Sequence, residues 1–153
     1  MVVVKHTGSS RLRSDRVEFS QVLLQSDIIS LHCPLTHETH HLIGEVELRS
    51  MKRDAILINC ARGGLVDHAA LSRALREGVI GGAGLDDVEG EPSSSNSPLN
   101  LHEPNLMVTS HVAWASHQSI EEFRQQLLEN LEGFAAGTPR NVITALDVNK
   151  RRA

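Results

Sequence analysis

The chain has 153 residues, of which 40% are hydrophobic, and a formal net charge of −4. That length fits one domain of ordinary size, and the small negative charge gives no reason to expect nucleic acid or a membrane as a partner. Aromatic residues are scarce, so Val, Ile and Leu must build the core. Two isolated cysteines, Cys33 and Cys60, do not suggest a disulfide framework, and they make a reducing, cytoplasmic compartment the expectation.

Apolar runs alternate with helical patterns along the whole chain. Strands are predicted over residues 1–4, 27–34, 55–60, 80–88 and 105–113. Helices are predicted over 17–26, 44–51 and 68–77, with Asp67 as the N-cap and Gly78 as the stop of the third. A last helix is predicted to begin near Ser116 and to end before Gly137. Apolar runs without polar alternation, separated by helices, are typical of a parallel sheet covered on both faces. The predicted fold class is therefore α/β, with a doubly wound parallel sheet.

Ligands bind outside the carboxyl ends of the strands in such a sheet. Three of these ends are followed by residues suited to chemistry: Arg62, Glu91 and His111. Glu89 competes with Glu91 for the role of the carboxylate. A guanidinium can hold a carboxylate and a carbonyl with two hydrogen bonds, and an imidazole can exchange a proton near neutral pH. A carboxylate beside an imidazole orients it and favours its protonated form. Together the three groups suit reduction of a 2-keto acid by a hydride donor.

Three segments also carry a family resemblance. "LINCARGGLVDHAALSRAL", "GAGLDDVEGEP" and "NLMVTSHVAWAS" resemble the three signatures of the D-isomer-specific 2-hydroxyacid dehydrogenases. The order Arg, Glu, His matches, as do the spacings of 29 and 20 residues. "DIISLHCPLTHETHHLIG" resembles the segment that lines the adenosine side of the cofactor cleft in that family. The resemblance covers residues 1–143, interpreted as a partial dinucleotide-binding domain, and leaves 144–153 as a C-terminal tail. "HVAWAS" and "GTPRNVI" favour the glycerate dehydrogenase/hydroxypyruvate reductase branch.

The resemblance implies a role for each site residue. Arg62 would clamp and polarise the substrate, His111 would be the acid/base, and Glu91 would pair with His111. Asp86 would hold the nicotinamide carboxamide. Further contacts to NAD or NADP would come from Cys33, Pro34, Leu35, Thr39, Cys60, Ala61, Arg62, His111 and Ala113. The implied substrate is a small 2-hydroxy or 2-keto acid, and the implied full-length form is a homodimer.

One family feature is absent from the sequence. The chain has no G-x-G-x-x-G, and "GVIGGAG" opens a strand instead of following one. In the resembled enzymes, that turn and the first strand precede a stretch like "MVVV". With the strand order 3-2-1-4-5-6, the missing first strand would lie between the "MVVV" and "AILINC" strands. We therefore expect an incomplete Rossmann-like sheet with two unmatched apolar edges. We also expect the chain to be the C-terminal part of a longer enzyme and to be inactive alone.

The sequence leaves several alternatives open. The chain offers no acidic residue before Asp15 to bind the adenosine ribose, whereas Ser9, Ser10, Arg11 and Arg13 offer sites for a 2′-phosphate, so NADP is nearly as well supported as NAD. The same fold also serves corepressor-like NAD-binding modules without catalysis, and an unrelated doubly wound domain is the third interpretation.

The two cysteines are interpreted as small buried strand residues and most histidines as solvated: His37, His40, His41, His68, His102 and His117. No metal site is expected from His37, His40 and His41, because no cysteine or carboxylate set completes it.

Overall fold

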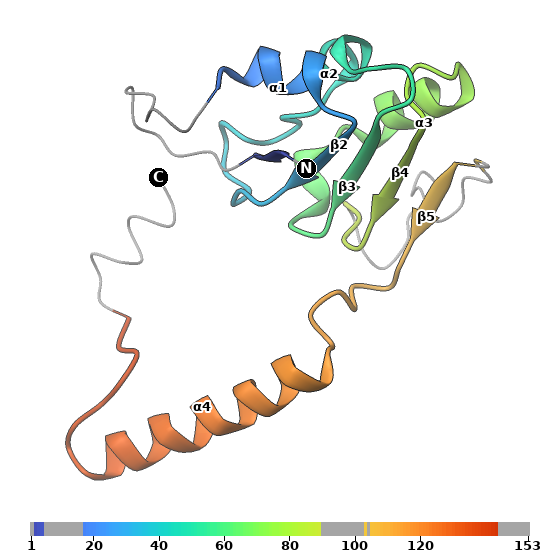
Figure 1. Cartoon of the computed structure of the whole chain (residues 1–153). Helices are drawn as coiled ribbons and strands as arrows, with labels where there is room; N and C mark the ends of the chain where they lie inside the picture. The colour runs from blue at the N-terminus through green and yellow to red at the C-terminus, as the bar shows by residue number, and fades with distance from the viewer. Residues whose placement is uncertain (1, 5–16, 90–102, 104, 144–153) are drawn as a thin grey trace. The chain divides into compact units, whose positions relative to one another are not determined.

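The computed structural model describes residues 2–4, 17–89, 103 and 105–143 (Figure 1). They group into two compact units, Met1–His111, which holds the sheet, and Val112–Ala153, which holds one long helix. No helix within the described ranges is long and apolar enough to cross a membrane. The elements in chain order are β1 (Val2–Val4), α1 (Phe19–Gln25), β2 (Ile28–Leu31), α2 (Glu45–Ser50), β3 (Ile56–Asn59), the 3-10 turn η1 (Gly63–Leu65), α3 (His68–Arg76), β4 (Gly82–Leu85), β5 (Leu106–Val108) and α4 (His117–Ala135).

All five strands form one parallel sheet in the order β1-β2-β3-β4-β5. Each strand therefore pairs with its neighbour in the chain, and helices connect β1 to β2, β2 to β3 and β3 to β4. This arrangement confirms the predicted α/β class with a parallel sheet. Parallel strands need such crossover connections, because each new strand must start again at the same edge of the sheet.

The strand order differs from the sequence prediction. The "MVVV" strand was expected beside a gap, with "AILINC" on the far side of that gap. Instead β1 pairs directly with β2, with Val2 opposite Ile29, and β2 pairs directly with β3. No gap therefore lies between β1 and β3 in the described sheet, and the predicted position of the two open edges is wrong, because the edge strands are β1 and β5. Backbone N–H and C=O groups along β2 need partners, and both neighbouring strands supply them.

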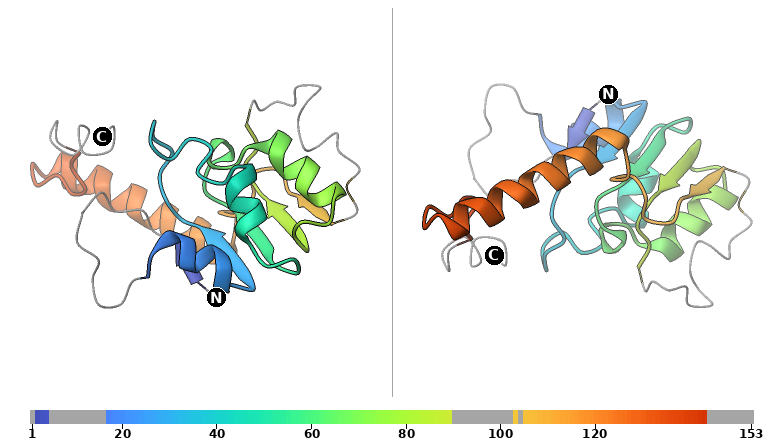
Figure 2. Two further views of the ribbon diagram at one scale, coloured as in Figure 1. Left: turned by 90° about the horizontal axis from the view of Figure 1, so that it is seen from above. Right: turned by 90° about the horizontal axis from the view of Figure 1, so that it is seen from below.

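One face of the sheet carries the core. Ile29, Leu31 and Leu57 are fully buried, while the alternate residues of the same strands are more accessible, as with Ile28 at 44%. Helices α1, α2 and α3 pack side by side in sequence, and Figure 2 (left) shows them across the same side of the sheet. Their buried side chains come from one helix face each, including Leu23, Leu48 and Leu71. The unit Met1–His111 thus supplies a helical layer for one sheet face.

The predicted helix ends are confirmed. Asp67 Oδ1 accepts a hydrogen bond from Ala70 N at 3.0 Å, and Ser116 Oγ accepts one from Ser119 N at 3.0 Å. Each bond satisfies one backbone donor that the first turn of a helix leaves open. Gly78, just after α3, has φ of +64°, a conformation that glycine adopts without strain. Asp67 matters most for function, because its helix begins directly after the turn that carries Arg62.

Candidate active site

The carboxyl ends of β3, β4 and β5 lie side by side. Asp86 N donates to Asn59 O at 2.9 Å, and Thr109 N donates to Leu85 O at 2.9 Å, so the ladder continues just past the strands. Arg62 follows β3, Asp86 follows β4 and His111 follows β5. Three of the predicted site residues are thus delivered to one edge of the sheet by three adjacent strands. This is the edge at which parallel α/β sheets bind their ligands.

Asn59 shapes the turn that presents Arg62. Its side chain is fully buried, its Nδ2 donates to Arg62 O at 2.8 Å, and its Oδ1 accepts from Ala61 N at 3.1 Å. One amide therefore holds two successive residues of the segment that leaves β3. The sequence interpretation did not assign Asn59 a role. The sequence did hold a signal for such a role, because Asn59 is a polar residue at a strand position whose side chain points into the core.

Replacing Asn59 by alanine should therefore destabilise the chain by about 2–3 kcal/mol, because it leaves two backbone groups of the turn without partners. Urea unfolding at 25 °C measures the difference. Asn105→Ala, at an exposed asparagine just before β5, is the matched control and should change stability by less than about 0.5 kcal/mol. Equal effects at both positions would show that Asn59 does not hold the turn.

Arg62 is exposed and has extended backbone angles, with φ of −147° and ψ of 136°. Its Nη1 donates to Ala61 O at 2.6 Å. The guanidinium makes this one hydrogen bond to the residues that the structure describes. A guanidinium carries five N–H donors in a fixed plane, so an accessible Arg62 suits the recognition of a planar, anionic group.

The two glycines after Arg62 let distant backbone segments approach. A Cβ on Gly63 would lie 2.4 Å from both Glu89 N and Val88 C, and one on Gly64 would lie 3.0 Å from Leu35 Cδ2. The turn after β3 is therefore pressed against the chain that follows β4 and against the loop that follows β2. Gly63 thus permits the close approach of a second backbone segment, whereas the nearest neighbours of Gly64 are side-chain atoms.

Asp86 is buried, with 3% of its surface exposed, at the end of β4. Thr109 Oγ1 donates to Asp86 Oδ1 at 2.5 Å, which links the ends of β4 and β5 through side chains. A carboxylate accepts several hydrogen bonds at once, so Asp86 has the chemistry that binding an amide N–H₂ requires. Thr109 orients that carboxylate, a role that the sequence interpretation did not assign.

His111 is exposed and has φ of 57°, in the left-handed region that few residues other than glycine adopt. Such conformations cost energy and are concentrated at functional sites. The backbone at the end of β5 thus turns sharply at the residue expected to be the acid/base. Ala113 lies in the other compact unit, Val112–Ala153, and Glu91 lies outside the described residues, so their roles stay predictions.

The loop after β2 holds four of the expected cofactor contacts. Cys33 is buried, whereas Pro34 and Leu35 are exposed. Thr39 is buried, and its hydroxyl donates to Pro34 O at 2.7 Å while accepting from Thr36 N at 2.7 Å. The Thr39 side chain therefore closes the loop on itself. Its structural task is to hold Pro34 and Leu35 in place at the edge of the site.

The cysteines only partly match their interpretation. Cys33 is a buried residue, as expected, but Cys60 is exposed, because it lies just past the end of β3 and not within the strand. Burial raises the pKa of both thiols, and the charge of Asp86 raises the pKa of Cys60 further. A thiol with a raised pKa is a poor nucleophile at neutral pH, so neither cysteine is suited to nucleophilic catalysis.

His68 corrects another expectation. It was interpreted as solvated, but it lies at the start of α3 and only 9% of it is exposed. Among the described residues, its Nε2 has no hydrogen-bond partner. Burial lowers the pKa of His68 below its ordinary value of 6.5, and the charge of Glu89 opposes that shift.

Because the folded pKa of His68 is lowered, the unfolded chain takes up a proton first as the pH falls below 6.5. Acidification should therefore reduce the free energy of unfolding, and His68→Gln should make that loss smaller. Urea unfolding at about pH 7.5 and about pH 5.5 measures both proteins. His37→Gln, at an exposed histidine, is the control and should retain the wild-type loss. An unchanged pH dependence in His68→Gln would refute the prediction.

Comparison with known proteins identifies the family of this chain. Residues 2–113 match the family described as "D-isomer specific 2-hydroxyacid dehydrogenase, NAD binding domain". The glycerate dehydrogenase of Methylorubrum extorquens is 52% identical over 130 residues, which are 84% of this chain and 41% of that protein. The glyoxylate reductase of Thermococcus litoralis is 43% identical over 140 residues, covering 91% of this chain and 42% of that protein. The chain thus spans less than half the length of these relatives.

Solved structures agree with the sequence matches. A D-isomer specific 2-hydroxyacid dehydrogenase from Lactobacillus delbrueckii ssp. bulgaricus, in its NAD complexed form, has a TM-score of 0.73 and 40% identity, and the match covers 82% of this chain and 43% of that one. An acyclic imino acid reductase in complex with NADPH has a TM-score of 0.77 and 35% identity, covering 94% of this chain and 46% of that one. The chain belongs to the D-isomer specific 2-hydroxyacid dehydrogenases, and its residues 2–113 match the NAD-binding domain of that family.

Proposed function

We propose that the chain is the cofactor-binding part of an NAD(P)-dependent oxidoreductase that interconverts a D-2-hydroxy acid and a 2-keto acid. The observation that carries the proposal is the delivery of Arg62, Asp86 and His111 to one sheet edge by three adjacent strands. The relatives named glycerate dehydrogenase and glyoxylate reductase support small substrates such as hydroxypyruvate or glyoxylate.

Each residue of the site has its own role in the proposed reaction. Arg62 binds the carboxylate and the keto oxygen of the substrate with its planar donors. His111 donates a proton to the keto oxygen during reduction and takes it back during oxidation. Glu91 pairs with His111 and favours its protonated form. The buried Asp86 carboxylate, oriented by Thr109, fits the carboxamide of a nicotinamide. The nicotinamide cofactor, when bound, supplies or accepts the hydride. The chain itself holds no G-x-G-x-x-G turn for the phosphates.

A chimera tests the proposal. This chain would replace the matching part of the Methylorubrum extorquens glycerate dehydrogenase, whose remaining residues supply the rest of an enzyme. We expect hydroxypyruvate-dependent oxidation of NADH or NADPH, and the ratio of kcat/KM for the two decides the cofactor. A folded chimera that binds the cofactor without turnover would favour the second candidate, a corepressor-like interaction module. The 153-residue chain alone should show no turnover, and detectable turnover would contradict that part of the proposal.

The proposal includes a homodimeric full-length form and a cytoplasmic location. The family resemblance supports the dimer. Both cysteines are free thiols, which suits a reducing compartment. Sedimentation of the full-length form tests the dimer, and fractionation of the source cell tests the location.

A further inference from the structure

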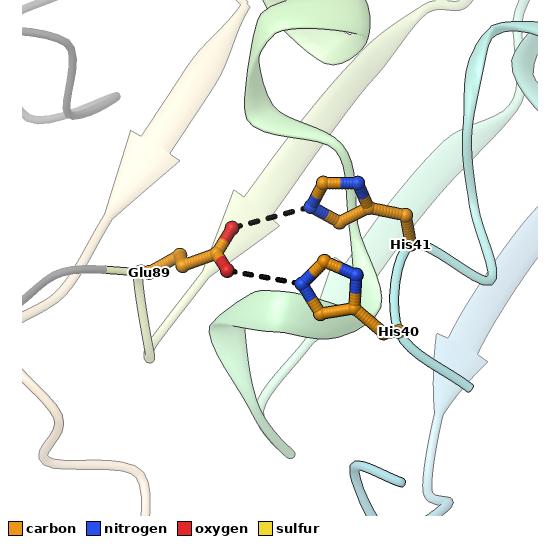
Figure 3. Close-up of side chains that lie close together, drawn as sticks. All are labelled: His40, His41 and Glu89. Carbon is orange, nitrogen blue, oxygen red and sulfur yellow. Dashed lines mark hydrogen bonds and ion pairs between the residues drawn. The ribbon is translucent and has the colours of Figure 1, made fainter. Parts of the chain in front are cut away.

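His40 and His41 meet Glu89, from a distant part of the sequence (Figure 3). The backbones of His41 and Glu89 contact the turn that carries Arg62. His40 Nε2 lies 3.2 Å from one carboxylate oxygen of Glu89, and His41 Nε2 lies 3.3 Å from the other. The two imidazole rings are stacked, with their centroids 3.9 Å apart. All three side chains are accessible to solvent. No metal site was expected from the sequence, because no carboxylate was found to complete the histidine set. In the structure Glu89 supplies that carboxylate, and His37 is not part of the cluster.

The backbone of the cluster is held from both sides. His41 N donates to Gly64 O at 2.7 Å, and His40 N donates to Thr36 O at 2.9 Å. On the other side, Glu89 N lies against Gly63, where even a Cβ would be too close. The ligand atoms of the three side chains all lie within 4.8 Å of one another. The positions of the three residues therefore depend on the fold and not on their mutual attraction.

The distances are compatible with a shared metal ion as well as with the two hydrogen-bonded ion pairs that the structure shows. Charge-assisted N–H···O contacts are about 2.7–2.9 Å long, whereas both contacts here are longer, at 3.2 and 3.3 Å. Ligand atoms bound at about 2.1 Å to one tetrahedral zinc ion are separated by about 3.4 Å. Two imidazole nitrogens and a carboxylate oxygen are donors that Zn²⁺ and similar ions accept, while Ca²⁺ and Mg²⁺ prefer oxygen ligands alone.

We propose that His40, His41 and Glu89 bind one divalent transition-metal ion of the Zn²⁺ class, with water completing the coordination. The ion joins the loop after β2 to the segment after β4 on the outside of the domain. It takes no part in hydride transfer, and the proposal stands whether or not the proposed function is correct.

The test uses the 153-residue chain without a histidine tag, freed of metal by a chelator and titrated with ZnCl₂ in a calorimeter. We expect one ion per chain. Glu89→Gln and His41→Asn should each weaken binding at least ~10-fold, whereas His37→Asn and His117→Asn, at exposed histidines outside the cluster, should not change it. Absence of stoichiometric binding, or equal affinity in the Glu89 variant and the wild type, would overturn the proposal.

A second readout needs no variant. In NMR spectra of the wild-type chain, Zn²⁺ should shift the ring signals of His40 and His41 together and leave those of His37 and His117 in place. The visible spectrum of bound Co²⁺ should differ from that of the hydrated ion. Shifts confined to other histidines would overturn the proposal, even if some zinc binds.

Discussion

Arg62→Ala should lower kcat/KM of the chimera for hydroxypyruvate by about 10²–10³-fold, because removal of a charged donor at the reacting carbonyl has an effect of that size in other enzymes. Arg62 is exposed at the end of β3, so its loss should leave the fold unchanged. Because Arg62 is one of several expected cofactor contacts, the affinity for the cofactor should fall far less than kcat/KM. Stopped-flow or steady-state oxidation of NAD(P)H measures the rate, and fluorescence titration measures the cofactor affinity.

Arg62→Lys separates charge from geometry. Lysine keeps the positive charge but lacks the planar pair of donors, so we expect a rate between those of the wild type and Arg62→Ala. If Arg62→Ala kept most of the activity, Arg62 would not be the substrate clamp. If the cofactor affinity of Arg62→Ala fell as far as kcat/KM, Arg62 would act on the cofactor and not on the substrate.

Gly63→Ala should destabilise the chain by about 3 kcal/mol, at the upper end of ordinary overpacking effects. The added Cβ would lie 2.4 Å from Glu89 N and Val88 C, and neither backbone atom can rotate away as a flexible side chain would. Either η1 or the segment after β4 must move. Urea unfolding at 25 °C measures the loss of stability.

The control for Gly63 is Gly78→Ala. Gly78 has open space around it but φ of +64°, so alanine there should cost only about 1 kcal/mol of conformational strain. A loss in Gly63→Ala no larger than that in Gly78→Ala would mean that the backbone segments do not touch as closely as described.

The local features of this chain could be predicted from its sequence. Asp67 was predicted to cap α3, and α4 was predicted to begin near Ser116, because the signals for helix ends lie within a few residues of them. Each strand also lay within a predicted apolar run. The motifs around Arg62, Asp86 and His111 identified the family, since their residue types and spacings are specific in combination.

The features that depend on distant segments were missed. The sequence predicted the strands but not their order, because apolar strands carry no local signal for which neighbour they pair with. Asn59 and Thr109 were missed as supports of the site, since their partners can be identified only once the strand ends are adjacent. His68 and Cys60 were misjudged because one residue at an element boundary can lie either inside or outside the core.

The sequence by itself therefore determined the class of the fold, the family and the three strand ends that deliver the candidate site. Only the tertiary structure decided that β1 pairs with β2 and that Glu89 faces His40 and His41. It also decided that residue 63 must lack a side chain, because the backbone of Val88 and Glu89 lies against it. The physical reason is the range of the interactions. Helix caps and hydrophobic periodicity act between near neighbours in the chain, whereas strand pairing and side-chain clusters join residues that only the folded core brings together.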